Sequence, residues 1–184
     1  MAEIGFETIL QEVKDDINRT CTAKTKVCEL AYKHGICRCK LENEFKKKHR
    51  ITLKKYIQFI LLCKLTEMII DDIMKVRKGE LPQIIHCYND ILQYKDPSCI
   101  CNLLIRNTGM TFTKYYDFVK TVLEIPPETF TDTFKNTFVN AFVNTNVNTF
   151  ENYFLRNLLQ KVFENYIFSS DNSTGSHDLN EDEE

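Results

Sequence analysis

Hydrophobic residues along the first two thirds of the chain recur every three or four positions, the spacing that places side chains on one face of an α-helix. The first such stretch carries charged residues largely on its other faces, so it predicts an amphipathic helix. Its hydrophobic positions are Phe6, Leu10, Val13, Ile17 and Cys21. Residues 52–78 are instead hydrophobic on nearly every side between Tyr56 and Cys63. A helix of that kind is surrounded by others, and we predict that residues 52–78 form the central helix of a bundle.

Glycine, proline and threonine residues predict where the helices begin and end. Gly35, Gly79 and Gly109 each follow a helical pattern, and glycine is the favoured residue just beyond a helix C-terminus. Thr52 suits the N-cap of the central helix, and Thr111 or Thr113 suits that of a later one. Further helices are predicted over residues 24–33, over residues 81–94 and between Asp96 and Gly109. The inner side of the helix predicted over residues 81–94 comprises Ile84, Ile85, Tyr88, Ile91 and Leu92.

A four-residue repeat begins at Thr129 and places phenylalanine in one register. Successive repeat positions advance by about 40° around an α-helix, so the first four rings span roughly 120° of one face, the width of an ordinary buried stripe. The repeat lacks phenylalanine at residues 144–148, where asparagine and threonine favour a break. The same residues also suit a β-strand, but the helical neighbours and the lack of hairpin dipeptides favour two helices within residues 129–168. The phenylalanines in register are Phe130, Phe134, Phe138, Phe142, Phe150 and Phe154.

Together these segments predict an all-α fold, a single-domain bundle of about seven to eight helices over residues 1–168. Residues 169–184, the acidic segment, contain no Lys or Arg and few bulky hydrophobic groups. That composition is typical of a disordered tail. The acids of the acidic segment are Asp171, Asp178, Glu181, Asp182, Glu183 and Glu184.

The net charge of −2 conceals a second, opposite concentration of charge. Between Lys33 and Lys55 the chain has nine basic residues and only two acids, Glu42 and Glu44. Residues 46–55, the basic segment, could bind phosphates of nucleic acid or of an anionic surface. The charge of the acidic segment could also compete for the same cations. The candidate polyanion-binding residues are Lys46, Lys47, Lys48, Arg50, Lys54 and Lys55.

The location expected for the chain is intracellular, either cytoplasmic, nuclear or both. The first 13 residues have no positively charged stretch of the kind that opens a secretory signal. The most hydrophobic stretch, at residues 59–63, is too short to span a bilayer. The eight cysteines are therefore expected to be reduced thiols. Abundant Lys, Asn, Phe and Tyr, together with the repeat, suggest an AT-rich genome such as that of a virus or a parasite.

Two C-x-C pairs, Cys37/Cys39 and Cys99/Cys101, invite a zinc site, with His34, His49 and His86 as further ligands. The spacing argues against zinc, because structural zinc pairs usually have two to four intervening residues. On a helix, residues two apart point about 200° away from each other, so a pair converges only where its backbone is not helical. Burial as small hydrophobic residues is the favoured interpretation of these cysteines.

No motif for catalysis or for cofactor binding is present: there is no Walker loop, dinucleotide fingerprint, H-E-x-x-H or G-x-S-x-G. Asp71 and Asp72 are adjacent on a helix and diverge by about 100°, which is unsuited to shared acid–base work. We therefore expect a chain that is not an enzyme and has no cofactor or metal.

The leading functional hypothesis is a non-enzymatic interaction and regulatory module that holds another protein, such as a partner helix. Because the phenylalanine stripe drifts around its helix, some rings would form an exposed hydrophobic patch. The candidate partner-binding residues are Phe130, Phe134, Phe138 and Phe142. The alternative hypothesis is binding of nucleic acid or an anionic surface by the basic segment. No known family is identified from these residues, although such bundles occur among viral proteins that modulate their hosts.

Overall fold

The computed structural model describes residues 2–83 and 85–124, and this part of the chain is entirely helical. It contains seven helices and no strand, which confirms the predicted all-α fold. The helices are α1 (Ala2–Thr20), α2 (Val27–Lys33), α3 (Arg38–His49), α4 (Leu53–Arg77), α5 (Ile85–Leu92), α6 (Ser98–Thr108) and α7 (Phe112–Val122).

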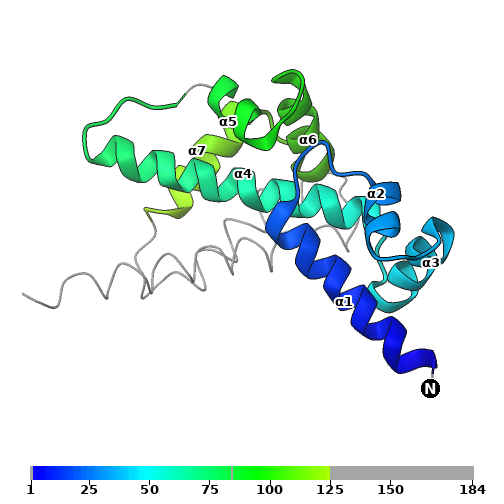
Figure 1. Cartoon of the computed structure of the whole chain (residues 1–184). Coiled ribbons are helices and arrows are strands. Elements are labelled where there is room, and N and C mark those ends of the chain that lie inside the picture. Colours follow the sequence, from blue (N-terminus) through cyan, green and yellow to red (C-terminus); the bar gives the residue numbers. More distant parts are fainter. Residues whose placement is uncertain (1, 84, 125–184) are drawn as a thin grey trace, which may run out of the picture.

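Helix α4 is the axis of the bundle, as the sequence predicts. It has 25 residues and is therefore about 37 Å long. Helices α1, α3, α5, α6 and α7 all contact it, α1 and α3 near its beginning and α5 and α7 farther along (Figure 1). Leu65, Ile69 and Ile70 have no exposed surface. Neighbours on several sides explain why the hydrophobic residues of α4 are not confined to one stripe.

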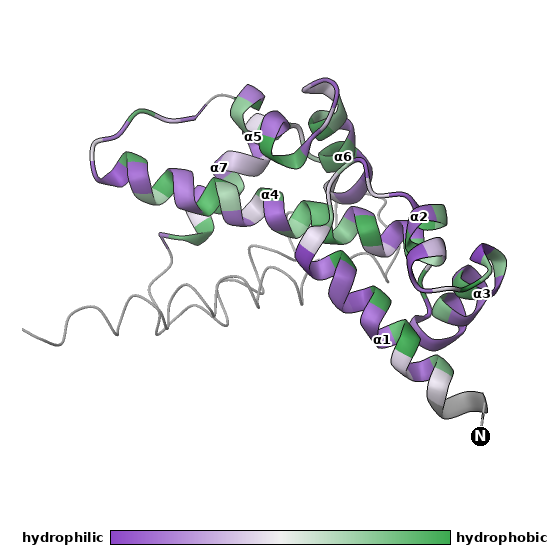
Figure 2. Cartoon of the chain, viewed as in Figure 1, coloured by the Kyte–Doolittle hydropathy of each residue, from purple (hydrophilic) through white to green (hydrophobic). Residues whose placement is uncertain are grey.

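Helix α1 is amphipathic and crosses the beginning of α4. Val13 and Ile17 are fully buried, and Leu10 is nearly so. Figure 2 shows hydrophilic residues along much of α1, with hydrophobic ones at intervals, and hydrophobic residues recurring along α4. The Tyr56 hydroxyl of α4 donates a hydrogen bond to Asn18 Oδ1 of α1 at 2.8 Å. This bond fixes where the two helices cross.

The predicted capping residues are found at the helix ends. Thr52 Oγ1 accepts a hydrogen bond from the backbone N–H of Lys55 at 3.2 Å, and Thr111, rather than Thr113, caps α7. Gly79, just beyond α4, has φ +90°, a backbone conformation that residues other than glycine rarely adopt. At these ends, local chemistry alone was enough to predict where a helix begins or stops.

Helix α5 is shorter than predicted, because it begins at Ile85 instead of residue 81. Leu81 is 91% exposed, and the backbone N–H of Gln83 donates to Asp72 Oδ1 at 2.8 Å. This bond anchors the connection to α4 before the helix starts. Tyr88 and Leu92 are buried as expected, but Ile91 is 60% exposed, so its predicted inward position is wrong.

Several predictions lie outside the described residues. They concern Ile84, the phenylalanine repeat with Phe130, Phe134, Phe138 and Phe142, the second helix expected before residue 168, and the acidic segment at residues 169–184. These remain predictions.

Candidate binding groove

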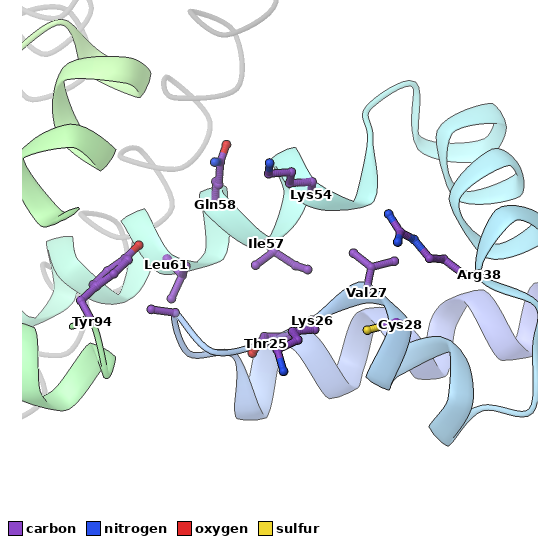
Figure 3. A pocket seen from close by; sticks show the side chains of 11 residues that line it. Thr25, Lys26, Val27, Cys28, Arg38, Lys54, Ile57, Gln58, Leu61 and Tyr94 are labelled. Carbon is purple, nitrogen blue, oxygen red and sulfur yellow. The ribbon is translucent and has the colours of Figure 1, made fainter. Parts of the chain in front are cut away.

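A groove with a volume of about 430 Å³ lies between the beginning of α2 and the first turns of α4 (Figure 3). Its walls come from four parts of the chain: the α1–α2 connection with α2, the start of α3, helix α4, and the α5–α6 connection. The lining residues are Ala23, Thr25, Lys26, Val27, Cys28, Arg38, Lys54, Ile57, Gln58, Leu61 and Tyr94.

The floor of the groove is hydrophobic. Ile57 and Leu61 point from α4 toward the α1–α2 connection, and Val27 faces them from α2 (Figure 3). Ile57 and Leu61 are one turn apart on α4 and also belong to the buried core. The floor is therefore the outer surface of the core, which can bury a hydrophobic side chain of a ligand.

Three cationic side chains surround this floor, and among the residues that the structure describes no carboxylate lines the groove. Lys26 Nζ lies 2.9 Å from Glu29 Oε1, and Arg38 Nη2 lies 3.3 Å from Glu42 Oε1. The hydrogen bond from Lys26 to Glu29 raises the pKa of the Lys26 ammonium, which keeps it charged. Lys54 makes no ion pair within residues 2–83 and 85–124. The groove therefore has a positive rim around a hydrophobic floor.

Hydrogen bonds to other helices hold the α1–α2 connection in place. The backbone N–H of Ala23 donates to the carbonyl of Leu92 at 2.9 Å, and Lys64 Nζ donates to the carbonyl of Cys21 at 2.8 Å. Tyr94, which also lines the groove, has a hydroxyl whose pKa is raised by burial to about 12. These contacts make the groove a preformed feature of the bundle.

A charged cluster holds α2 against α1 and so positions one wall of the groove. Lys33 Nζ lies 2.7 Å from both carboxylate oxygens of Asp16, whose side chain is almost fully buried. His34 Nε2 lies 3.6 Å from Asp16 Oδ2, and His34 Nδ1 lies 3.7 Å from Glu12 Oε2. The hydrogen bond from Lys33 is the largest of the effects that lower the pKa of Asp16, against the opposing effect of burial.

The six residues predicted to bind polyanions are all exposed, but only Lys54 lines the groove. Lys46, Lys47 and Lys48 lie in the last turn of α3, where the helix dipole favours positive charge. Lys48 Nζ also lies 3.3 Å from Glu7 Oε1 of α1. The local structure of α3 therefore accounts for part of the basic segment without any ligand.

The cysteine pairs are placed differently from each other, and their predicted burial is wrong: Cys37 and Cys39 are exposed, and Cys99 and Cys101 are only half-buried. Cys37 has an extended backbone just before α3, whereas Cys99 and Cys101 both lie in the first turns of α6, as expected. Backbone N–H groups of Lys40 and Cys39 lower the pKa of the Cys37 thiol. Within residues 2–83 and 85–124, no three His, Cys, Asp or Glu side chains are grouped so as to hold a metal ion.

The other histidines considered as zinc ligands have different surroundings. His49 packs against Phe45, with 4.5 Å between ring centroids, and burial lowers its pKa. His86 is exposed on α5.

Asp71 and Asp72 diverge, as their adjacent positions predict: Asp71 is exposed and Asp72 is buried. Besides accepting from Gln83, Asp72 accepts a hydrogen bond from the Tyr116 hydroxyl at 2.9 Å. The Tyr88 hydroxyl is buried nearby, and desolvation raises its pKa. This carboxylate thus joins α4 to α7 and to the α4–α5 connection, which is a structural role.

Comparisons of the chain with protein-family models, with curated proteins and with solved structures found no match. Among the helices between residues 2 and 124, none has both the length and the hydrophobic character needed to cross a bilayer.

Sequence reasoning missed most of the groove. Lys26 and Tyr94 lie in connections between helices, and nothing in their local sequence indicates that they meet α4. Arg38 and Lys54 belong to the nine basic residues between Lys33 and Lys55. That concentration of positive charge was the only signal of this site in the sequence.

Proposed function

We propose that the chain is a non-enzymatic binding module that holds an acidic peptide stretch of another protein in the groove between α2 and α4. The observation that supports this function is a hydrophobic floor surrounded by three cations, with no carboxylate in the lining within the described part of the chain. Hydrophobic side chains of the ligand would cover Ile57 and Leu61, and its carboxylates would pair with Lys26, Arg38 and Lys54. Such mixed recognition is typical of peptide-binding grooves.

The charge of the rim would govern partner choice and association rate more than affinity. Exposed ion pairs contribute only about 0.2–1 kcal/mol each, so burial of hydrophobic side chains must supply much of the binding free energy. An acidic ligand without hydrophobic residues is therefore expected to bind weakly and to dissociate as salt is added.

Fluorescence anisotropy with a labelled peptide that alternates carboxylate side chains with leucine tests this function. We expect binding to the full chain and a loss of about tenfold in affinity for Lys54→Glu, which replaces an attraction by a repulsion of similar size. Lys46→Glu is the matched control, because it makes the same change in net charge on an exposed lysine outside the groove. It should alter the affinity less than about twofold at physiological salt.

The outcome that contradicts this function is equal loss of affinity in both variants, or a failure to bind both by the wild-type chain and by a chain whose six acids at residues 169–184 are replaced by the corresponding amides. A labelled single-stranded oligonucleotide is measured alongside. Tighter binding of the oligonucleotide, with loss in Lys46→Glu and a steep dependence on salt, would favour polyanion binding by the basic segment instead. That second candidate is supported by the exposure of its six cations, which run from the last turn of α3 through the α3–α4 connection to the first turn of α4.

The phenylalanine patch predicted from the repeat concerns the same class of function but a different surface. Phe138→Asp in the full chain tests that surface separately. If the variant stays folded and keeps every partner, the repeat is not the contact surface.

A further inference from the structure

We propose that the acidic segment, residues 169–184 of the same chain, occupies the groove and competes with the outside ligand. The competition rests on the proposed function, whereas the occupancy can be measured without it. The chain would then regulate its own binding site.

Charge complementarity supports this occupant. The groove presents Lys26, Arg38 and Lys54, and none of its described lining residues is a carboxylate. The acidic segment has six carboxylates and no Lys or Arg. Leu179 is its one large aliphatic residue and directly follows Asp178, with Glu181 two positions later. Leucine beside carboxylates matches a hydrophobic floor beside cations.

The ion pairs already present at the rim do not prevent the acidic segment from occupying the groove. Each of these ion pairs joins residues within one helix or at its start: Lys26 with Glu29, and Arg38 with Glu42. All four side chains are more than a third exposed. Exposed pairs of this kind contribute little to stability, so carboxylates of the acidic segment can replace Glu29 and Glu42 at small cost. Lys54 has no such pair to lose among residues 2–83 and 85–124.

The chain between α7 and the acidic segment is long enough to reach the groove. The end of α7 lies beside the end of α4, because Arg77 Nη2 donates to the carbonyl of Leu123 at 3.5 Å. The groove lies about 20 residues back along α4, or roughly 30 Å. About 45 residues separate Glu124 from Ser169, and they span roughly 67 Å even in a fully helical state.

Cys28 provides a direct reporter, since it lines the groove and is exposed in the structure. The full chain is treated with iodoacetamide, and peptide mass spectrometry follows the alkylation of each cysteine. The comparison is with a variant in which the six acids of the acidic segment are replaced by the corresponding amides. We expect Cys28 to be alkylated at least about threefold faster in the variant, because neither cover nor added negative charge then slows it.

Cys87 is the matched control, because it is an exposed thiol on α5 outside the groove. Its rate should be equal in the two chains, and circular dichroism should show the same helix content. A second measurement needs no variant: raising salt from about 0.05 M to about 0.5 M should speed alkylation of Cys28 relative to Cys87 in the wild-type chain only. Equal Cys28 rates in the two chains at both salt concentrations would overturn the proposal.

Peptide binding to the neutralised variant separates this inference from the proposed function. If Cys28 is unaffected but the outside peptide binds, the groove is a docking site without self-occupancy. If Cys28 is protected in the wild-type chain and no outside peptide binds to the variant, self-occupancy stands and the proposed function fails.

Discussion

At its beginning, α4 leaves a groove open to solvent between itself and α2, whereas farther along α5 and α7 close over it around buried polar groups. The open end has its charges at the rim, on Lys26, Arg38 and Lys54. The closed end has a carboxylate inside, with Asp72 accepting from both Gln83 and Tyr116. One helix therefore supports two kinds of packing.

The difference indicates which end is available to a ligand. Buried hydrogen bonds are directional and costly to leave unmade, so the closed end has one arrangement. A rim of exposed charges above a hydrophobic floor can exchange its partners at little cost. Function is therefore expected at the open end, and stability at the closed one.

The largest expected effect comes from two leucines one turn apart on α4. Leu65→Ala removes a side chain with no exposed surface and should lower the free energy of unfolding by about 2–5 kcal/mol, because an enclosed cavity is left. Leu61→Ala should cost less, because Leu61 lines the groove and its truncation enlarges an open groove instead of leaving an enclosed cavity. Urea unfolding measures both, and an equal or larger loss for Leu61→Ala would contradict the distinction between open and closed packing.

A smaller effect is expected from the polar contacts of the closed end. Asp72→Ala leaves the N–H of Gln83 and the hydroxyl of Tyr116 without their acceptor, and should lower stability by about 1–3 kcal/mol. Tyr116→Phe removes one of these bonds together with its donor and should cost about 1 kcal/mol. Thermal or urea unfolding gives the order. A stability of Asp72→Ala equal to that of the wild type would show that the carboxylate is not holding α7.

The smallest expected effect at neutral pH comes from the ionisation of buried tyrosines, which lowers stability only in alkali. It concerns the open end and the closed end of α4 alike. Burial raises the pKa of Tyr56 and of Tyr116 to about 12 each. The unfolded chain releases these protons near pH 10, so their contribution to stability is complete below pH 10 and declines as the pH rises to about 12.

Urea titrations at several alkaline pH values measure this decline. The slope due to the buried Tyr56 is at most about 1.4 kcal/mol per pH unit, and Tyr56→Phe should make the decline shallower. A stability that is constant from pH 9 to pH 12 would contradict the assignment of both tyrosines.

Where local chemistry determines structure, the sequence was a sufficient guide. Thr52 and Thr111 cap their helices through their own hydroxyls, and Gly79 ends α4 through its own backbone freedom. The buried stripe of α1 and the central position of α4 follow from hydrophobic spacing alone. Each of these features depends on residues within a few positions of one another.

Where distant residues meet, the sequence was not sufficient. Residues 81–83 were predicted to be helical, yet a hydrogen bond between Gln83 and Asp72 anchors the connection. A local signal did exist, since Pro82 disfavours helical backbone at the residue before it. The groove carried no comparable signal, because Lys26 and Tyr94 are brought to α4 by bonds such as that between Ala23 and Leu92. For the same reason, only Lys54 of the predicted polyanion residues belongs to it.

The position of α4 in the chain has a consequence for synthesis. The hydrophobic face of α1, with Val13 and Ile17, packs against a helix that begins 33 residues after α1 ends. At about 5–20 residues per second, a ribosome needs roughly 2–7 seconds to complete that stretch. During this interval the face of α1 lacks its main partner and is a target for chaperones. Ribosome-bound chains from which α1 but not α4 has emerged should therefore recruit them, and chains from which α4 has also emerged should release them.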